Sequence, residues 1–213
     1  QDLAMTCYNL GLLYGDINRY TEAEEYYKRA YAIYKRIIDK KDGNIEWEFA
    51  NVCNNLGTLY HNRKILKHFH RRKRRLEYAT TYYLEACKIY NKLYKKYAKK
   101  YAADLARIAF NLGDLCLKRK QREPAVLFFK KAANIYESLV AENSEEYEGY
   151  FATSCFYLTK LLSNKSETFV EAITYCTKAQ EAAEKLVERG EKKYKKIAMV
   201  ARKILAMYKW ATT

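Results

Sequence analysis

Apolar residues recur along the chain at offsets of three, four and seven, which places them on one face of an α-helix. A stripe of alanine, an aromatic residue, alanine and tyrosine shows this most clearly at Ala23, Tyr27, Ala30 and Tyr34. Helix-breaking residues are rare, because the 213 residues include one proline and seven glycines. The pattern therefore predicts an all-α protein with mostly long helices.

The stripe occurs four times, which indicates a repeat. Its first alanine lies at residues 23, 79, 125 and 172, and its second at 30, 86, 132 and 179. An earlier apolar segment precedes each stripe and is written CYNLGLLY, CNNLGTLY, AFNLGDLC or CFYLTKLL. The leucines at the fourth position of these segments, here called marker leucines, are Leu10, Leu56, Leu112 and Leu158, at spacings of 46, 56 and 46 residues. Helix pairs of this kind cannot bury their stripes alone, so we expect four pairs to stack.

The residue types within the repeat favour close packing between the two helices of a pair. Gly11, Gly57 and Gly113 directly follow the marker leucines in the first three repeats. Glycine and the stripe alanines let two helices approach, while leucine, tyrosine and phenylalanine fill the remaining space. The fourth repeat departs from the pattern, because Thr159 replaces the glycine and Cys176 replaces the stripe aromatic.

The combined pattern Leu-Gly-x-x-Tyr followed by Ala-x-x-x-Phe/Tyr-x-x-Ala resembles the signature of the tetratricopeptide-repeat family. The resemblance extends from about Ala4 to Arg189. The long repeat period and the Asn-Leu-Gly motif are similar to those of a subgroup that includes kinesin light chains and bacterial tetratricopeptide proteins. The resemblance implies an α-solenoid of four helix pairs in a right-handed superhelix. An amphipathic segment after Gly190 predicts a C-terminal capping helix.

We expect residues 1–213 to form one domain that is part of a longer chain, because the sequence begins within a helical pattern and without methionine. The expected repeats cover about 2–43, 44–98, 99–143 and 144–190, and the capping helix covers 191–211.

Repeat two carries ten extra residues between its helices, within the stretch HNRKILKHFHRRKRRLEYA at 61–79. This stretch supplies eight positive charges and no compensating acid between His61 and Leu76, of a net charge of +15 for the chain. Such charge attracts acidic peptides, nucleic acid or anionic lipid. The candidate basic patch is Arg71, Arg72, Lys73, Arg74 and Arg75. The stretch is interpreted either as a second contact for an acidic partner or as a solvated loop.

Metal binding and catalysis lack the motifs that they need. None of the six cysteines forms a C-x-x-C pair, and three share the position three residues before the marker: Cys7, Cys53 and Cys155. We expect buried, reduced thiols there, which are typical of the cytoplasm. The histidines His61, His68 and His70 have no nearby acid or cysteine, so a solvated loop is favoured over a metal site. We expect no catalytic residue, no metal and no cofactor, and no apolar run is long enough to span a membrane.

The resemblance places ligand binding on the concave face formed by the first helix of each pair, where the family binds peptides. An asparagine precedes the marker in three repeats, at Asn9, Asn55 and Asn111, and such amides can hydrogen-bond to a ligand backbone. The alternative is that asparagine only belongs to the consensus of the subgroup. Aromatic residues beside Lys and Arg suit an apolar anchor with acidic flanks. The candidate ligand-binding residues are Tyr8, Asn9, Asn51, Asn55, Arg107, Phe110, Asn111, Lys118, Tyr157 and Lys160.

These features predict a non-enzymatic scaffold that binds a peptide segment, acidic and with an apolar or aromatic anchor, from another protein. Two alternatives remain open. One is a nucleic-acid-binding module that uses the basic stretch of repeat two and the lysine-rich segments 92–100 and 192–196. The other is a regulatory domain that senses a short peptide, as in bacterial receptors built on similar repeats.

Overall fold

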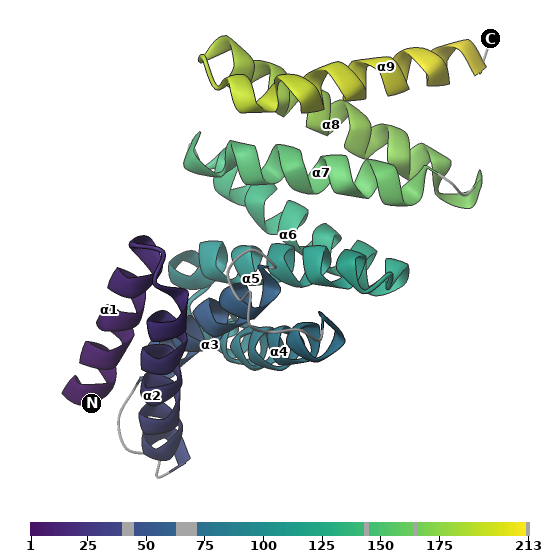
Figure 1. Cartoon of the computed structure of the whole chain (residues 1–213). Coiled ribbons are helices and arrows are strands. Elements are labelled where there is room, and N and C mark those ends of the chain that lie inside the picture. The colour runs from purple at the N-terminus through teal and green to yellow at the C-terminus, as the bar shows by residue number, and fades with distance from the viewer. Residues whose placement is uncertain (40–44, 63–71, 143–144, 164–165, 212–213) are drawn as a thin grey trace. The chain divides into compact units, whose positions relative to one another are not determined.

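The computed structural model describes residues 1–39, 45–62, 72–142, 145–163 and 166–211, and throughout these ranges the chain forms helices joined by short turns (Figure 1). No strand occurs among these residues, so the prediction of an all-α protein is confirmed. The chain divides into two compact units, Gln1–Tyr101 and Ala102–Thr213. None of the described helices is long and apolar enough to cross a membrane.

The first unit consists of two helix pairs and the beginning of a third. Its helices are α1 (Asp2–Asp16), α2 (Tyr20–Asp39), α3 (Glu46–His61), α4 (Arg72–Lys96) and the first residues of α5 (Ala98–Lys118). Helix α1 packs against α2, α2 against α3, and α3 against α4. Helices consecutive in the chain are therefore neighbours in space, as the repeat predicts.

The second unit continues in the same way. It contains the rest of α5, then α6 (Arg122–Ala141), η1 (Glu145–Tyr147), α7 (Glu148–Leu162), η2 (Ser166–Thr168), α8 (Phe169–Glu188), η3 (Lys192–Tyr194) and α9 (Lys195–Ala211). Helix α6 packs against α7, α7 against α8, and α8 against α9.

The alanine positions of the repeated stripe form the core of both units. All eight are fully buried: Ala23, Ala30, Ala79, Ala86, Ala125, Ala132, Ala172 and Ala179. An alanine side chain fits where two helices approach closely, because it adds only one methyl group to the backbone. The helical faces predicted from the sequence are thus the buried faces.

In the first three repeats, the glycine after the marker leucine lies directly beneath the stripe aromatic of the same pair. A Cβ atom built at Gly113 would lie 2.9 Å from the ring of Phe129. The fourth repeat fills the same space in the opposite way, because Thr159 and the smaller Cys176 are both fully buried. Two departures from the sequence pattern therefore compensate for each other in volume.

Left-handed backbone conformations close two of the turns within helix pairs. Asn18 and Lys120, each eight residues after its marker leucine, have φ values of 62° and 61°. The next amide in each turn donates to a carbonyl near the end of the first helix, Arg19 to Tyr14 at 2.8 Å and Gln121 to Cys116 at 2.9 Å. These bonds satisfy carbonyl groups that the helix itself leaves without partners.

The basic patch predicted within repeat two requires a correction. Residues 63–71 and the side chain of Arg72 lie outside the described residues, so two of the five patch residues, Arg71 and Arg72, and the expected helix extensions lie outside them too. Lys73 and Arg74 are exposed at the beginning of α4. Arg75 is only 4% exposed and donates to the backbone carbonyl of Tyr60. Its assignment to a surface patch is wrong, because the helical rotation from residue 74 to 75 turns it towards α3.

His61 also differs from the prediction of a solvated side chain. It is 7% exposed at the end of α3 and meets the ring of Tyr83 edge to face, at 5.8 Å between centroids. The hydroxyl group of Tyr83 lies 3.4 Å from its Nδ1 atom. His61 therefore belongs to the packing between α3 and α4.

Candidate functional site

The ten candidate ligand-binding residues fall into two groups, one in each unit. The first unit holds Tyr8 and Asn9 on α1 and Asn51 and Asn55 on α3. The second unit holds Arg107, Phe110, Asn111 and Lys118 on α5 and Tyr157 and Lys160 on α7. All of them lie on the first helices of pairs. The asparagine ladder spans both units, so it remains a prediction.

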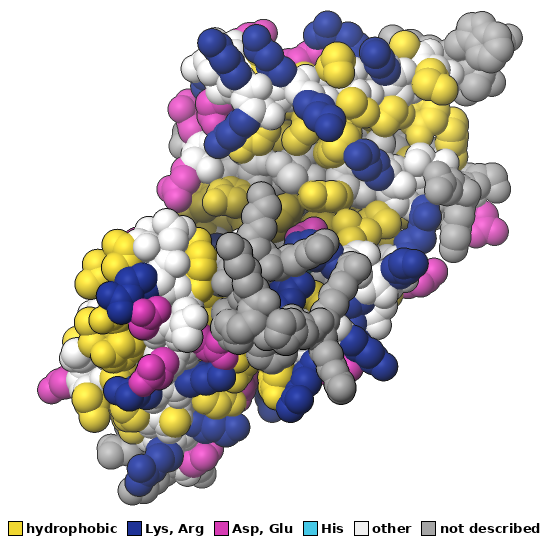
Figure 2. Space-filling view, in the orientation of Figure 1, with side chains coloured by type: hydrophobic (Ala, Val, Ile, Leu, Met, Phe, Trp, Pro, Cys, Tyr) yellow, Lys and Arg dark blue, Asp and Glu magenta, His cyan; other side chains and the backbone are white. Residues whose placement is uncertain are grey.

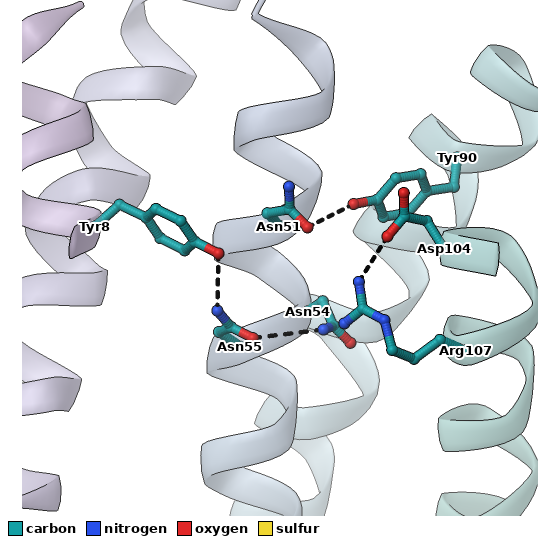
Figure 3. A network of polar contacts seen from close by, with 7 residues as sticks. All are labelled: Tyr8, Asn51, Asn54, Asn55, Tyr90, Asp104 and Arg107. Carbon is teal, nitrogen blue, oxygen red and sulfur yellow. Dashed lines mark hydrogen bonds and ion pairs between the residues drawn. The ribbon is translucent and has the colours of Figure 1, made fainter. Parts of the chain in front are cut away.

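In the first unit, a hydrogen bond joins two candidate residues from consecutive repeats. Asn55 Nδ2 donates to the hydroxyl group of Tyr8 at 3.1 Å, which links α3 to α1 (Figure 3). The ring of Tyr8 lies 6.0 Å from that of Tyr27 beneath it. Asn9 is exposed on the same helix as Tyr8. One amide hydrogen of Asn55 is thus used in a hydrogen bond to the neighbouring repeat.

Asn51 has a structural role that the sequence did not reveal. Its Oδ1 atom accepts a hydrogen bond of 2.7 Å from the hydroxyl group of Tyr90, which is fully buried (Figure 3). A buried hydroxyl group without an acceptor would cost about 1–3 kcal/mol. The side-chain carbonyl oxygen of Asn51 therefore serves as the acceptor for a buried tyrosine of the core. The only signal in the sequence was the tyrosine that ends the first three stripes, since a buried tyrosine usually needs a partner.

In the second unit, three aromatic rings from three helices form one cluster. Tyr157 of α7 stacks on Phe129 of α6 at 4.9 Å and 14° between planes. Phe110 of α5 meets Tyr157 at 6.1 Å and Phe129 at 5.5 Å. Phe129 is fully buried, whereas Phe110 and Tyr157 are half-buried and reach the surface. Phe110 and Tyr157 occupy the same two repeat positions as Tyr8 and Asn55.

The charged candidates of the second unit lie on α5 and α7, the helices that carry Phe110 and Tyr157, and acidic side chains accompany them. Arg107 pairs with Asp104 at 2.7 Å on α5 (Figure 3). Lys118 pairs with Asp114 at 3.0 Å, also on α5. Ion pairs within one exposed helix contribute only about 0.3–0.5 kcal/mol, so a ligand can compete for these cations.

Lys160 adds a positive charge to α7, and Tyr157 adds a neutral hydroxyl group. The ammonium group of Lys160 lies 4.4 Å above the ring of Phe156. Burial, with a smaller contribution from Asp114, raises the pKa of Tyr157, so its hydroxyl group stays neutral and can donate. Lys160, Arg107 and Lys118 set three cations against the two carboxylates of Asp104 and Asp114, which leaves the face weakly positive.

The metal-ligating side chains and the cysteine thiols are considered next, within the part of the chain that the structure describes. No group of three or more His, Cys, Asp or Glu residues is placed to hold a metal ion there. All six cysteines are free and buried. Burial raises the pKa of the Cys155 thiol to about 12, which disfavours the reactive thiolate.

A buried carboxylate in the first unit was missed by sequence reasoning. Glu24 accepts a hydrogen bond of 2.6 Å from the hydroxyl group of Tyr60 and pairs with Lys28 at 2.5 Å. An acid near the start of a helix is typical of a surface position near the positive end of the dipole. Glu24 instead links α2 to α3, and this role depends on the tyrosine that ends the second marker segment.

Two stretches of the chain match family models described as tetratricopeptide repeat, residues 3–41 and residues 106–139. The chain therefore contains tetratricopeptide repeats. The matches cover the first and third of the predicted repeats, one in each unit. Repeats of this family generally mediate protein–protein interactions and are generally not enzymes. The predicted repeat boundaries and the handedness of the superhelix stay predictions.

One solved structure supports the fold of this tetratricopeptide-repeat protein. It is described as the crystal structure of BtubC (BKLC) from P. vanneervenii, with 20% sequence identity and a TM-score of 0.61. The match covers 86% of this chain and 64% of the BtubC chain, so the protein spans less than two thirds of the length of BtubC. Together with the family matches, this likeness confirms an all-α repeat solenoid.

Another solved structure, described as a DHF58 filament, is 16% identical, covers 97% of this chain and 92% of its own, and has a TM-score of 0.33. No curated protein matches the chain.

Proposed function

We propose that this tetratricopeptide-repeat protein is a scaffold that binds a peptide segment of another protein on the first helices of its repeats. The observation that carries the proposal is the contact between the half-buried rings of Phe110 and Tyr157, on helices α5 and α7, which also carry Lys118 and Lys160. Exposed aromatic rings held by a rigid core are typical anchors of protein interfaces.

The chemistry of this face suggests the kind of peptide that it binds. An apolar or aromatic side chain would pack against Phe110 and Tyr157, at about 0.5–1.5 kcal/mol beyond the area that it buries. Acidic residues on either side would approach Lys118 and Lys160. Because Asp114 already pairs with Lys118, we expect the preference for acidic flanks to be modest and to reside mainly in Lys160.

The first unit offers a surface of related chemistry on α1 and α3. Tyr8 is half-buried, and Asn9 is exposed one residue further along α1. The amide of Asn55 has two hydrogens, of which the Tyr8 hydroxyl group accepts one. We expect these groups to hydrogen-bond to the backbone of a bound segment, which would give affinity with little dependence on its sequence.

A charge reversal at Lys160 tests the acidic preference directly. The probe is a fluorescein-labelled 11-residue peptide with a central tryptophan flanked by aspartate and glutamate. We expect Lys160→Glu to weaken its binding about 5- to 10-fold, because attraction becomes repulsion at a partly desolvated site. Fluorescence anisotropy measures the affinity, with Lys185→Glu on the exposed face of α8 as the matched control.

Two companion peptides isolate the anchor from the charge. In one the tryptophan is replaced by alanine, and in the other the acids are replaced by lysines. We expect both to bind more weakly than the probe. Equal binding of all three peptides, or an equal effect of Lys185→Glu and Lys160→Glu, would contradict the proposal.

The free cysteines support a reducing compartment, and we propose a cytoplasmic location. All six cysteines are free, including Cys53, which is fully buried beside Glu85 at 3.8 Å. Free cysteines are common where glutathione keeps thiols reduced.

A basic turn between α4 and α5 favours nucleic-acid binding as a second candidate function. Lys95, Lys96, Lys99 and Lys100 are all exposed there. Tyr97 is 47% exposed among them, and the ammonium group of Lys96 lies 5.1 Å from its ring centre. An exposed aromatic ring among lysines is the arrangement on which a single-stranded base can stack.

Salt dependence tests this candidate. We expect a labelled 20-nucleotide single strand to bind at low salt, and the affinity to fall steeply as salt rises, because bound cations are released. Replacement of the four lysines by alanine should reduce both the affinity and the salt slope. The candidate fails if no complex forms at 50 mM salt, or if the four-lysine variant binds as the parent does.

A further inference from the structure

The fourth repeat carries an aromatic side chain where the other three carry an acid. Asp2, Glu48 and Asp104 stand eight residues before their marker leucines, and Tyr150 stands at this position in α7. Asp2 and Glu48 lie in the first turns of their helices, where the helix dipole favours a carboxylate. Tyr150 gains nothing from the dipole and remains 48% exposed, so neither helix electrostatics nor burial fully accounts for the exchange.

The ring of Tyr150 is held by a stack of tyrosines in the second unit. It lies 5.4 Å from the ring of Tyr136 with 18° between planes, and Tyr136 also stacks with Tyr147 at 6.0 Å and 23°. Tyr136 is 1% exposed and belongs to the core. One face of the Tyr150 ring is therefore covered by Tyr136, and the exposed part of the ring is presented to solvent in a fixed orientation.

Carboxylates gather at the same end of α7. Burial and, after it, the charge of Glu146 raise the pKa of Tyr147, and Glu146 itself is exposed on η1. Glu145 and Glu148 share a single cation, because both pair with Arg189, at 3.4 and 2.6 Å. Figure 2 shows Asp and Glu side chains together at the left, near the end at which α7 begins in Figure 1. Carboxylates thus outnumber the cation that pairs with them at the start of α7.

The proposed peptide-binding face therefore changes in charge along α7. Tyr150 precedes Tyr157 by seven residues, or two helical turns, so the two rings lie on one side of the helix. Lys160 follows Tyr157 by three residues. From its start to its end, this side of α7 presents carboxylates, the ring of Tyr150, the ring of Tyr157 and the ammonium group of Lys160.

We propose that Tyr150 forms a subsite of this face for an arginine or lysine side chain of the bound peptide. The subsite rests on the proposed function, because it assigns the second flank of the same peptide. A cation over the exposed ring face is attracted by the electrons of the ring and by the carboxylate of Glu146. Arginine is favoured over lysine, since its planar guanidinium group stacks on a ring. The acidic flank of the peptide then lies towards Lys160 and the cationic flank towards Tyr150.

The distance between the two rings sets the spacing within the peptide. Seven residues of helix span about 10.5 Å at 1.5 Å per residue. An extended peptide covers this distance in three to four residues, at about 3.1–3.4 Å each. The cation is therefore expected three or four residues from the apolar anchor, and both chain directions satisfy this spacing.

Three fluorescein-labelled peptides of equal length test the subsite. The first is the acidic tryptophan peptide used for Lys160→Glu. The second has arginines three and four places after the tryptophan, and the third has them three and four places before it. We expect one arginine peptide to bind about 3- to 5-fold more tightly than the acidic peptide, and the other to show no gain because its charges meet like charges. Fluorescence anisotropy measures each affinity.

Variants of the ring separate its face from its hydroxyl group. Tyr150→Ala should remove the gain of the arginine peptide, and Tyr150→Phe should keep it, since the ring face attracts the cation. Tyr97→Ala is the matched control, because Tyr97 is 47% exposed in the first unit, and it should change none of the affinities. Circular dichroism verifies that each variant is folded. If Tyr150→Ala is unfolded, Glu146→Lys takes its place and should also abolish the gain.

The outcomes distinguish the subsite from the proposed function. Failure of the acidic peptide to bind the parent protein would overturn both. If that peptide binds and neither arginine peptide binds more tightly, the subsite alone is overturned. Equal weakening of all three peptides by Tyr150→Ala would also overturn it, because the ring would then be a general apolar contact. The same holds if Tyr150→Phe loses the gain as completely as Tyr150→Ala.

Discussion

Replacement of Gly57 by alanine is expected to lower the free energy of unfolding by about 2 kcal/mol, although alanine favours helix by about 1 kcal/mol. A Cβ atom at residue 57 would lie 2.4 Å from Cδ1 and 2.5 Å from Cε1 of the Tyr83 ring. Tyr83 is 1% exposed, and its hydroxyl group donates to Thr58 at 3.1 Å, so the ring cannot move away freely. Overpacking of a dense core costs about 3 kcal/mol at its upper range, which exceeds the gain in helix propensity.

Gly15 provides the matched control for this measurement. It also lies within a helix, but a Cβ atom there would meet only the hydroxyl oxygen of Tyr27, at 3.8 Å. We expect Gly15→Ala to leave stability unchanged or to raise it by up to about 1 kcal/mol. Urea unfolding followed by circular dichroism compares the two variants. If Gly57→Ala proves as stable as Gly15→Ala, the close packing of α3 on α4 is not as described.

The helices and their buried faces could be predicted because the repeat presents the same evidence four times. The stripe alanines have a single physical role, which is to allow close approach, so their spacing alone identified the core. The exchange of Gly and aromatic for Thr159 and Cys176 was visible in the sequence as two separate departures. Only the structure shows that both side chains are fully buried and together fill the space that glycine and an aromatic ring fill in the other repeats.

Polar contacts between helices could not be predicted in the same way. The Tyr90 hydroxyl group donates to Asn51, and Asn55 donates to the Tyr8 hydroxyl group. Each bond needs a donor–acceptor distance of about 3 Å, which is smaller than the shift that one residue of register produces, so the sequence pattern does not determine it. Asparagine is usually exposed, so its type gives no warning of such a role. Phe110 and Tyr157 were predicted as candidate residues because the resemblance places their positions, two and one before the marker leucine, on the concave face, and their rings are in contact.

The pattern of α9 could have been recognised from the sequence. An alanine six residues before each marker leucine is buried in every first helix, and its counterpart in α9 completes the series Ala4, Ala50, Ala106, Ala152 and Ala198. The departure of Leu205 from glycine obscured the fifth member. A capping helix and the first helix of a repeat look alike in hydrophobic pattern, because both bury an apolar face.

Replacement of Arg75 by alanine is expected to lower the free energy of unfolding by about 2 kcal/mol, whereas Arg74→Ala should change it by less than about 0.5 kcal/mol. Arg75 is 4% exposed and donates to the carbonyl oxygen of Tyr60, one of the last four carbonyl groups of α3. These carbonyls have no partner within their own helix, and a buried one left without a donor costs about 1–3 kcal/mol.

The neighbouring arginine makes the comparison decisive, because both variants remove the same charge from adjacent residues. Arg74 is exposed, and its contacts are with Tyr78 one turn later, a hydrogen bond of 3.4 Å and a ring contact of 5.9 Å. Such contacts on a solvated helix face contribute little. Urea unfolding of the two variants should therefore separate them by about 1.5 kcal/mol or more. Equal losses would mean that the net positive charge around residues 73–75, and not the bond from Arg75 to Tyr60, determines the stability of the junction between α3 and α4.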